Sequence, residues 1–139
     1  MLLQKLVWVF LRIHLHLVVI IKKKNHLISK GDFKFTYQTQ KPIIALLPGS
    51  RKQEIEFMLP EMLKVVDEYP NHQFIVGATN TFSKEYYQSF LKGKNVEFVF
   101  NETYGLLSTA TAAIVTSGTA SLEAALFKVP QVVCYKTNW

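Results

Sequence analysis

The 139-residue sequence is poor in residues that crosslink a fold or hold metals. Cys134 is the single cysteine, so no disulfide can form within the chain and a reducing compartment is expected. Cys134 lies in an apolar run, where it is best interpreted as a small buried hydrophobe. The four histidines are His14, His16, His26 and His72. They show no metal-ligand spacing with one another, with cysteine or with acidic residues, so we predict no metal site and no cofactor.

Three common signatures are also missing. The sequence contains no Gly-x-Gly-x-x-Gly, no Gly-x-x-x-x-Gly-Lys-Ser/Thr and no Gly-x-Ser-x-Gly. Dinucleotide oxidoreductases, nucleoside triphosphatases and α/β-hydrolases therefore lose their usual support. Internal repeats are absent as well.

Acidic residues are scarce in the first part of the chain. Residues 1–40 hold seven Lys or Arg against one acid, Asp32, whereas residues 41–139 hold nine of each sign. The net charge of +6 therefore belongs entirely to residues 1–40. A nucleic-acid interpretation would depend on that segment alone, and we predict no nucleic-acid partner. We divide the chain into a basic apolar segment with its linker, 1–40, and a main domain, 41–139.

The stretch 1–21 is almost continuously apolar, but basic residues interrupt it. A spanning helix would lose several kcal/mol for each charge near its centre, so a membrane span is disfavoured. At helical spacing, a narrow basic stripe is formed by Lys5, Arg12, His16 and Lys23. This pattern is typical of a helix on an anionic membrane surface, and we predict peripheral binding. Residues 12–17 also alternate with period two, so helix and strand both remain open here.

The main domain alternates short apolar runs with amphipathic segments. Strands are predicted to begin near Ile43, Gln73, Val96, Ala112 and Gln131. Helices are predicted from about residue 54 to 66, over 83–91, over 102–109 and over 120–127, with Pro60 kinking the first or delaying its start. The alternation predicts an α/β fold, with a parallel Rossmann-like sheet and helices on both faces. Ligands of such sheets bind beyond the carboxyl ends of the strands.

One loop at such an end is Pro48-Gly49-Ser50-Arg51. Gly49 permits close approach to the backbone, and Ser50 can donate a hydrogen bond or cap the following helix. Arg51 offers a bidentate fork suited to phosphate. The alternative for Arg51 is a surface ion pair with Glu54 or Glu56.

A second loop, Ser117-Gly118-Thr119, ends a strand and opens a helix. The first N–H groups of a helix have no intrahelical partner and carry partial positive charge, so this turn can bind an anion. Ser121 adds a further hydroxyl. Glu123 could cap free N–H groups or accept hydrogen bonds from a sugar. The alternative for the whole turn is an ordinary capped helix start.

Together, residues 45–55, 116–123 and 128–135 closely resemble lipid-A-disaccharide synthase. The resemblance runs from about Lys41 to Trp139 and covers the first part of that family's C-terminal, nucleotide-sugar-binding domain. It implies half of a glycosyltransferase B architecture. It also implies transfer of 2,3-diacylglucosamine from UDP-2,3-diacylglucosamine to 2,3-diacylglucosamine 1-phosphate in lipid A biosynthesis.

By resemblance, Gly49, Ser50 and Arg51 would face the donor diphosphate. Ser117, Gly118 and Thr119 would hold phosphate oxygens, with Ser121 nearby, and Glu123 would accept from the ribose hydroxyls. The family's general base belongs to an acceptor domain that this sequence lacks, and residues 1–40 do not resemble the family. We therefore expect a fragment, inactive by itself, of a cytoplasmic enzyme peripheral to the inner face of the inner membrane.

Two other interpretations remain open. The chain could belong to another UDP-sugar enzyme, an epimerase or a different glycosyltransferase, or it could be a non-catalytic nucleotide-binding remnant.

Overall fold

The computed structural model describes Tyr37 and residues 39–135. The predicted membrane-surface segment lies outside these residues. Within the described part of the chain, no helix combines the length and the apolar character that a membrane crossing requires.

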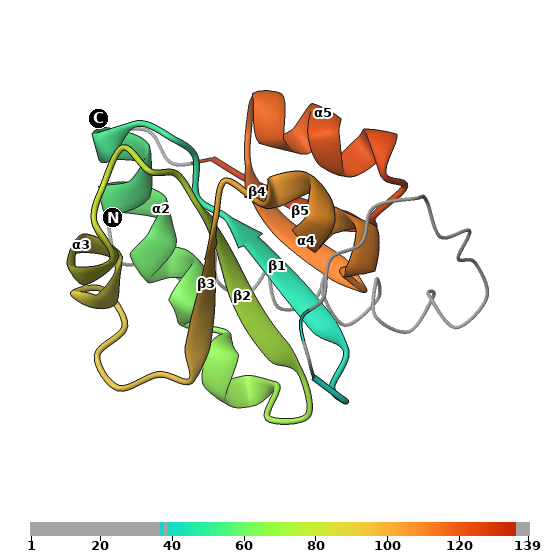
Figure 1. The fold of residues 1–139 in the computed structure, drawn as a ribbon, viewed down its shortest axis with the longest axis horizontal. Coiled ribbons are helices and arrows are strands. Elements are labelled where there is room, and N and C mark those ends of the chain that lie inside the picture. Colours follow the sequence, from blue (N-terminus) through green and yellow to red (C-terminus); the bar gives the residue numbers. More distant parts are fainter. Residues whose placement is uncertain (1–36, 38, 136–139) are drawn as a thin grey trace, which may run out of the picture.

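The core of the fold is a five-stranded, all-parallel sheet (Figure 1). Its strands are β1 (Ile43–Leu47), β2 (Gln73–Ala78), β3 (Val96–Phe100), β4 (Ala112–Thr116) and β5 (Gln131–Cys134). Their order across the sheet is β3-β2-β1-β4-β5. The five strand positions and the parallel Rossmann-like class predicted from the apolar runs are confirmed.

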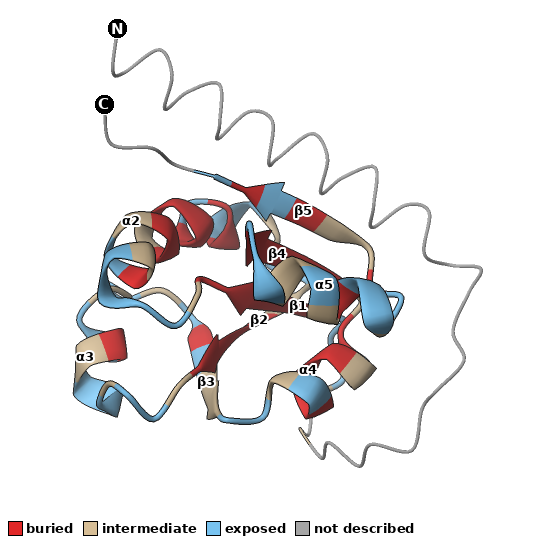
Figure 2. Ribbon diagram, turned by 90° about the horizontal axis from the view of Figure 1, so that it is seen from above, coloured by how far each residue is buried: buried red, intermediate tan, exposed pale blue. Residues whose placement is uncertain are grey.

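Helices cover both faces of this sheet, as predicted. They are α2 (Lys52–Leu63), the 3-10 turn η2 (Val66–Glu68), α3 (Lys84–Gln88), α4 (Thr103–Thr109) and α5 (Thr119–Leu126). One apolar cluster packs α2 and α3 against alternate strand residues, and the other packs α4 and α5 against the opposite face. Burial is therefore concentrated in the strands, while the outward sides of the helices are largely exposed (Figure 2).

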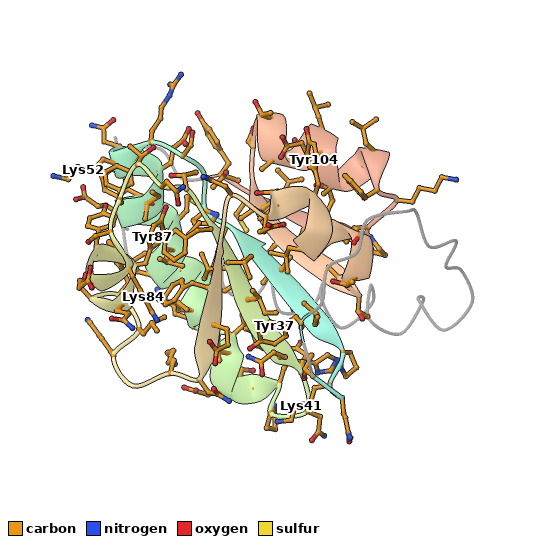
Figure 3. All side chains as sticks on the ribbon, in the orientation of Figure 1. Tyr37, Lys41, Lys52, Lys84, Tyr87 and Tyr104 are labelled. Atoms are coloured by element: carbon orange, nitrogen blue, oxygen red, sulfur yellow. The ribbon has the colours of Figure 1, made fainter. Side chains whose placement is uncertain are left out.

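Two helices differ in detail from the sequence expectation. α2 begins at Lys52 and continues through Pro60, so the late start is wrong. α3 ends at Gln88 instead of Leu91, because the following residues form tight turns with i→i−3 hydrogen bonds and Lys92 and Gly93 adopt positive φ. Tyr87 of α3 is nevertheless fully buried between this helix and the sheet (Figure 3).

The strand order changes direction at the centre of the sheet. From β1 the chain proceeds outward to β2 and β3, then returns to place β4 on the other side of β1. The loops after β1 and β4 therefore emerge side by side at the carboxyl edge. The hydroxyl of Thr116, at the end of β4, donates to the carbonyl of Leu47, at the end of β1, over 3.4 Å.

Candidate functional site

A cleft of about 460 Å³ opens at this carboxyl edge. It is lined by the ends of β1, β2 and β4 and by the first residues of α2, α4 and α5. The lining residues are Leu47, Gly49, Ser50, Arg51, Glu54, Gly77, Thr79, Thr103, Thr116, Ser117, Gly118, Thr119, Ala120 and Glu123. The structure thus brings together both predicted loops and Glu123. Ser121 is the only predicted site residue that does not line the cleft.

The loop after β1 is held by a side chain from α2. One carboxylate oxygen of Glu54, Oε2, accepts the backbone N–H groups of Ser50 at 3.1 Å and of Arg51 at 3.2 Å. Gly49 adopts a φ of +97°, and a Cβ there would lie 2.3 Å from the same oxygen. Glycine at position 49 is therefore required both by backbone conformation and by the space that Glu54 fills.

The side chain of Arg51 is available at the rim of the cleft. Arg51 is exposed, and among the residues that the structure describes it takes part in no salt bridge. Glu56 instead pairs with Lys52 at 3.9 Å, and Glu54 is bonded to backbone N–H groups. Arg51 therefore forms no ion pair with Glu54 or Glu56, and that alternative is wrong.

The opposite wall of the cleft is the start of α5. Gly118 precedes the helix with a φ of 129°, and a Cβ there would meet nothing within 4 Å. No acid lies in the first turn of α5, and its N-cap residue provides no side-chain hydrogen bond. The Ser121 hydroxyl donates to the Gly118 carbonyl at 2.6 Å and does not cover the first N–H groups. The Ser121 N–H also donates to that carbonyl, at 3.2 Å, so the N–H groups of Thr119 and Ala120 are the ones left without a partner among the described residues.

Glu123 lies one turn further along α5 and is partly exposed in the cleft. Its carboxylate accepts no hydrogen bond from any residue that the structure describes. The capping role considered for Glu123 is thus not fulfilled, and the carboxylate is left as an acceptor facing the cavity.

Sequence reasoning missed several lining residues. Gly77 lies inside the apolar run of β2, where a Cβ would approach Leu47 Cδ2 to 2.6 Å, so this glycine keeps the floor of the cleft open. Thr79 follows β2 and donates its backbone N–H to the Tyr87 hydroxyl at 3.2 Å. Thr103 is the first residue of α4. The one signal available from sequence was Glu54, which stands three residues after the helix N-cap in the spacing of a capping box.

Cys134 lies on the other side of the sheet from α5, packed in the cluster with α2. Burial, with a smaller contribution from Glu61, raises the pKa of its thiol to about 12. A thiol in that state is neutral near pH 7 and does not act as a nucleophile. The interpretation of Cys134 as a buried hydrophobe is confirmed by its 3% exposure.

The sequence is similar to known proteins well beyond the residues of the cleft. The family model described as lipid-A-disaccharide synthetase matches residues 16–139. Lipid-A-disaccharide synthase of Psychromonas ingrahamii is 37% identical over 109 residues, which cover 73% of this chain and 29% of that protein. The enzyme of Coxiella burnetii is 36% identical over 107 residues, covering 74% and 28%. Lipid-A-disaccharide synthase 1 of Legionella pneumophila is 36% identical over 104 residues, covering 70% and 27%.

The chain spans less than a third of the length of these relatives. The matched family is a family of glycosyltransferases, and its model covers most of the present sequence, including both cleft loops and the whole sheet. The chain therefore belongs to the lipid-A-disaccharide synthetase family.

Proposed function

We propose that residues 41–139 form the UDP-binding part of a lipid-A-disaccharide synthase, with the donor diphosphate in the cleft between the loops after β1 and β4. The observation that supports the proposal is that both loops line the same cleft. Two loops far apart in sequence, one with a free guanidinium and one with an uncapped helix start, face the same cavity of about 460 Å³. That size suits a nucleotide-sized ligand.

Each site residue predicted from the sequence has a part in this proposal. Gly49, Ser50 and Arg51 face one side of the diphosphate, and the N–H groups of Gly118 and Thr119 donate to its oxygens from the other side. Ser117 contributes its hydroxyl, because its own N–H donates to the Cys134 carbonyl at 3.1 Å. Ser121 holds the Gly118 carbonyl and so supports the turn. The Glu123 carboxylate accepts hydrogen bonds from the ribose hydroxyls, which fits its lack of a protein partner among the described residues.

The chemistry of the transfer fits such groups. Departure of UDP from a sugar builds negative charge on the phosphate, and preorganised N–H donors together with an arginine stabilise that charge. The substrates in this proposal are UDP-2,3-diacylglucosamine and 2,3-diacylglucosamine 1-phosphate. The general base for the acceptor hydroxyl is expected outside the residues matched here.

Two further parts of the proposal concern the rest of the protein. Residues 1–24 would bind an anionic lipid surface, placing the protein at the inner face of the inner membrane, where acylated substrates are accessible. Vesicle flotation that weakens with salt would support this, and absence of binding would refute it. The boundary between the N-terminal segment and the nucleotide domain is proposed at residue 40, although the family match begins at residue 16.

Calorimetry on the 139-residue chain tests the proposed function. We expect weak UDP binding and no sugar transfer. Glu123→Gln should weaken UDP more than it weakens pyrophosphate, because its proposed partner is the ribose. Equal losses for both ligands would remove Glu123 from ribose recognition, and no UDP binding by the folded wild-type chain would refute the proposal.

A further inference from the structure

The cleft presents an electrostatic problem for a diphosphate ligand. Its charged lining residues are Arg51 against Glu54 and Glu123. Two carboxylates and one guanidinium would repel an anion if all three were equally free. The way in which Glu54 is engaged therefore decides how the cleft can hold phosphate.

The two helices that begin at the cleft differ in how their N-termini are satisfied. In α2 the third helical residue is Glu54, and its carboxylate accepts the N–H groups of Ser50 and Arg51. In α5 the third helical residue is Ser121, whose hydroxyl and N–H both donate to the Gly118 carbonyl, so no side chain caps the N–H groups of Thr119 and Ala120. The start of α2 is thus already occupied by a carboxylate of the protein, whereas the start of α5 is not.

From this contrast we infer that Glu54 is a positioning residue that occupies the anion position at the start of α2, fixes the Gly49–Arg51 loop, and so directs the ligand diphosphate to the start of α5. The inference extends the proposed UDP site and depends on it. Glu54 touches no ligand in this scheme. It acts through the backbone that carries Arg51.

The space around Gly49 supports a built arrangement. The Glu54 side chain lies directly beneath Gly49, so closely that a Cβ at position 49 would approach the Glu54 Cβ to 2.9 Å and its Oε2 to 2.3 Å. A phosphate could bind the N–H groups of Ser50 and Arg51 only after this carboxylate had left. The contact between the Glu54 carboxylate and the loop therefore does two things. It fixes the Gly49–Arg51 backbone, and it keeps an anion away from the start of α2.

The test separates the charge of Glu54 from its geometry. Glu54→Gln keeps an oxygen that can accept both N–H groups but removes one negative charge from the cleft. We expect the affinity for pyrophosphate and UDP to rise about threefold to tenfold at low salt, with the gain fading in 0.5 M salt and uridine affinity unchanged. Glu56→Gln is the matched control, because it removes the same charge from an exposed residue of α2 that does not line the cleft.

Glu54→Ala tests the positioning itself through a double-mutant cycle. If Glu54 places Arg51, then Arg51→Ala should weaken UDP binding much less in the Glu54→Ala background than in the wild type. A role confined to helix stability would leave the two substitutions additive. Should Glu54→Ala fail to fold, the same cycle is made with Glu54→Gln, whose pyrophosphate affinity also decides whether the Glu54 carboxylate excludes an anion from the start of α2.

Several outcomes would overturn the inference. The first is that Glu54→Gln binds pyrophosphate more weakly than the wild type, or only as tightly as Glu56→Gln does. The second is that the effects of the Glu54 and Arg51 substitutions on UDP binding are additive. If the wild type binds pyrophosphate but not UDP, the proposed function fails while the Glu54 inference is still decided by the pyrophosphate response. If neither the wild type nor Glu54→Gln binds pyrophosphate, both fail.

Discussion

Replacing Arg51 with alanine tests the proposed diphosphate site most directly. A hydrogen bond to a charged group contributes about 1.5–3 kcal/mol, so the loss should weaken UDP binding roughly 10- to 150-fold. Arg51 is exposed and lies in no salt bridge within the described part of the chain, so its removal breaks no internal ion pair. The free energy of unfolding should therefore change by only about 0.5 kcal/mol or less.

Lys52→Ala provides the matched control. Its side chain is 67% exposed, pairs with Glu56, and projects outward from the start of α2 (Figure 3). The substitution Lys52→Ala removes a positive charge from the residue next to Arg51 in sequence, and Lys52 does not line the cleft. Calorimetry should show equal losses of UDP and pyrophosphate affinity for Arg51→Ala, with uridine unaffected and Lys52→Ala near wild type. The argument is refuted if Lys52→Ala loses as much, or if uridine binding falls with UDP binding.

Three further predictions concern stability and reactivity. At position 49 an alanine would combine a positive φ with a collision against Glu54, whereas at Gly93, with a similar φ of +81°, its Cβ would meet nothing within 4 Å. Urea unfolding should therefore show that Gly49→Ala is destabilised by about 1–3 kcal/mol relative to wild type, and by more than Gly93→Ala. Equal losses of stability in the two variants would show that the Glu54 contact does not contribute. Because burial raises the pKa of Cys134 to about 12, its thiol should resist a disulfide reagent at neutral pH until the chain is unfolded, and rapid labelling of the native protein would contradict this. Burial lowers the pKa of His72 from 6.5, so the unfolded chain binds a proton at this residue more readily than the native chain does. The free energy of unfolding should therefore decrease as pH falls from 6.5 through the lower native pKa. His72→Gln should reduce this dependence of stability on pH, and an unchanged dependence would contradict the prediction.

The centre of the sheet was predictable because β1, β2 and β4 are buried almost throughout and so appear in sequence as continuous apolar runs. Ile43–Leu47 and Ala112–Thr116 are buried at every position. The end of α3 was less predictable, because the aromatic side chains of 86–90 pack on the core whether their backbone is helical or turned. Phe90 contacts Tyr86 edge to face although it lies beyond the helix.

The two loops of the cleft could be predicted from their place after strands, but their partners could not. Gly77 and Thr79 enter the cleft because β2 pairs with β1, and the sequence does not specify that order. Glu54 could be recognised as near a helix start. That its carboxylate reaches back to the N–H groups of Ser50 and Arg51 depends on the loop conformation that Gly49 allows.

The cleft and the sheet also depend on each other energetically. The two loops of the cleft are adjacent because β4 pairs with β1, and the Thr116 hydroxyl donates to the Leu47 carbonyl across a separation of 69 residues. A ligand that bridges the two loops binds the paired state and not the separated one, so at one hundred times its Kd it would stabilise the fold by about 2.7 kcal/mol. If the cleft binds UDP as proposed, that binding and β1–β4 pairing are linked equilibria, and a substitution that loosens this strand pair should lower UDP affinity even when it touches no residue of the cleft.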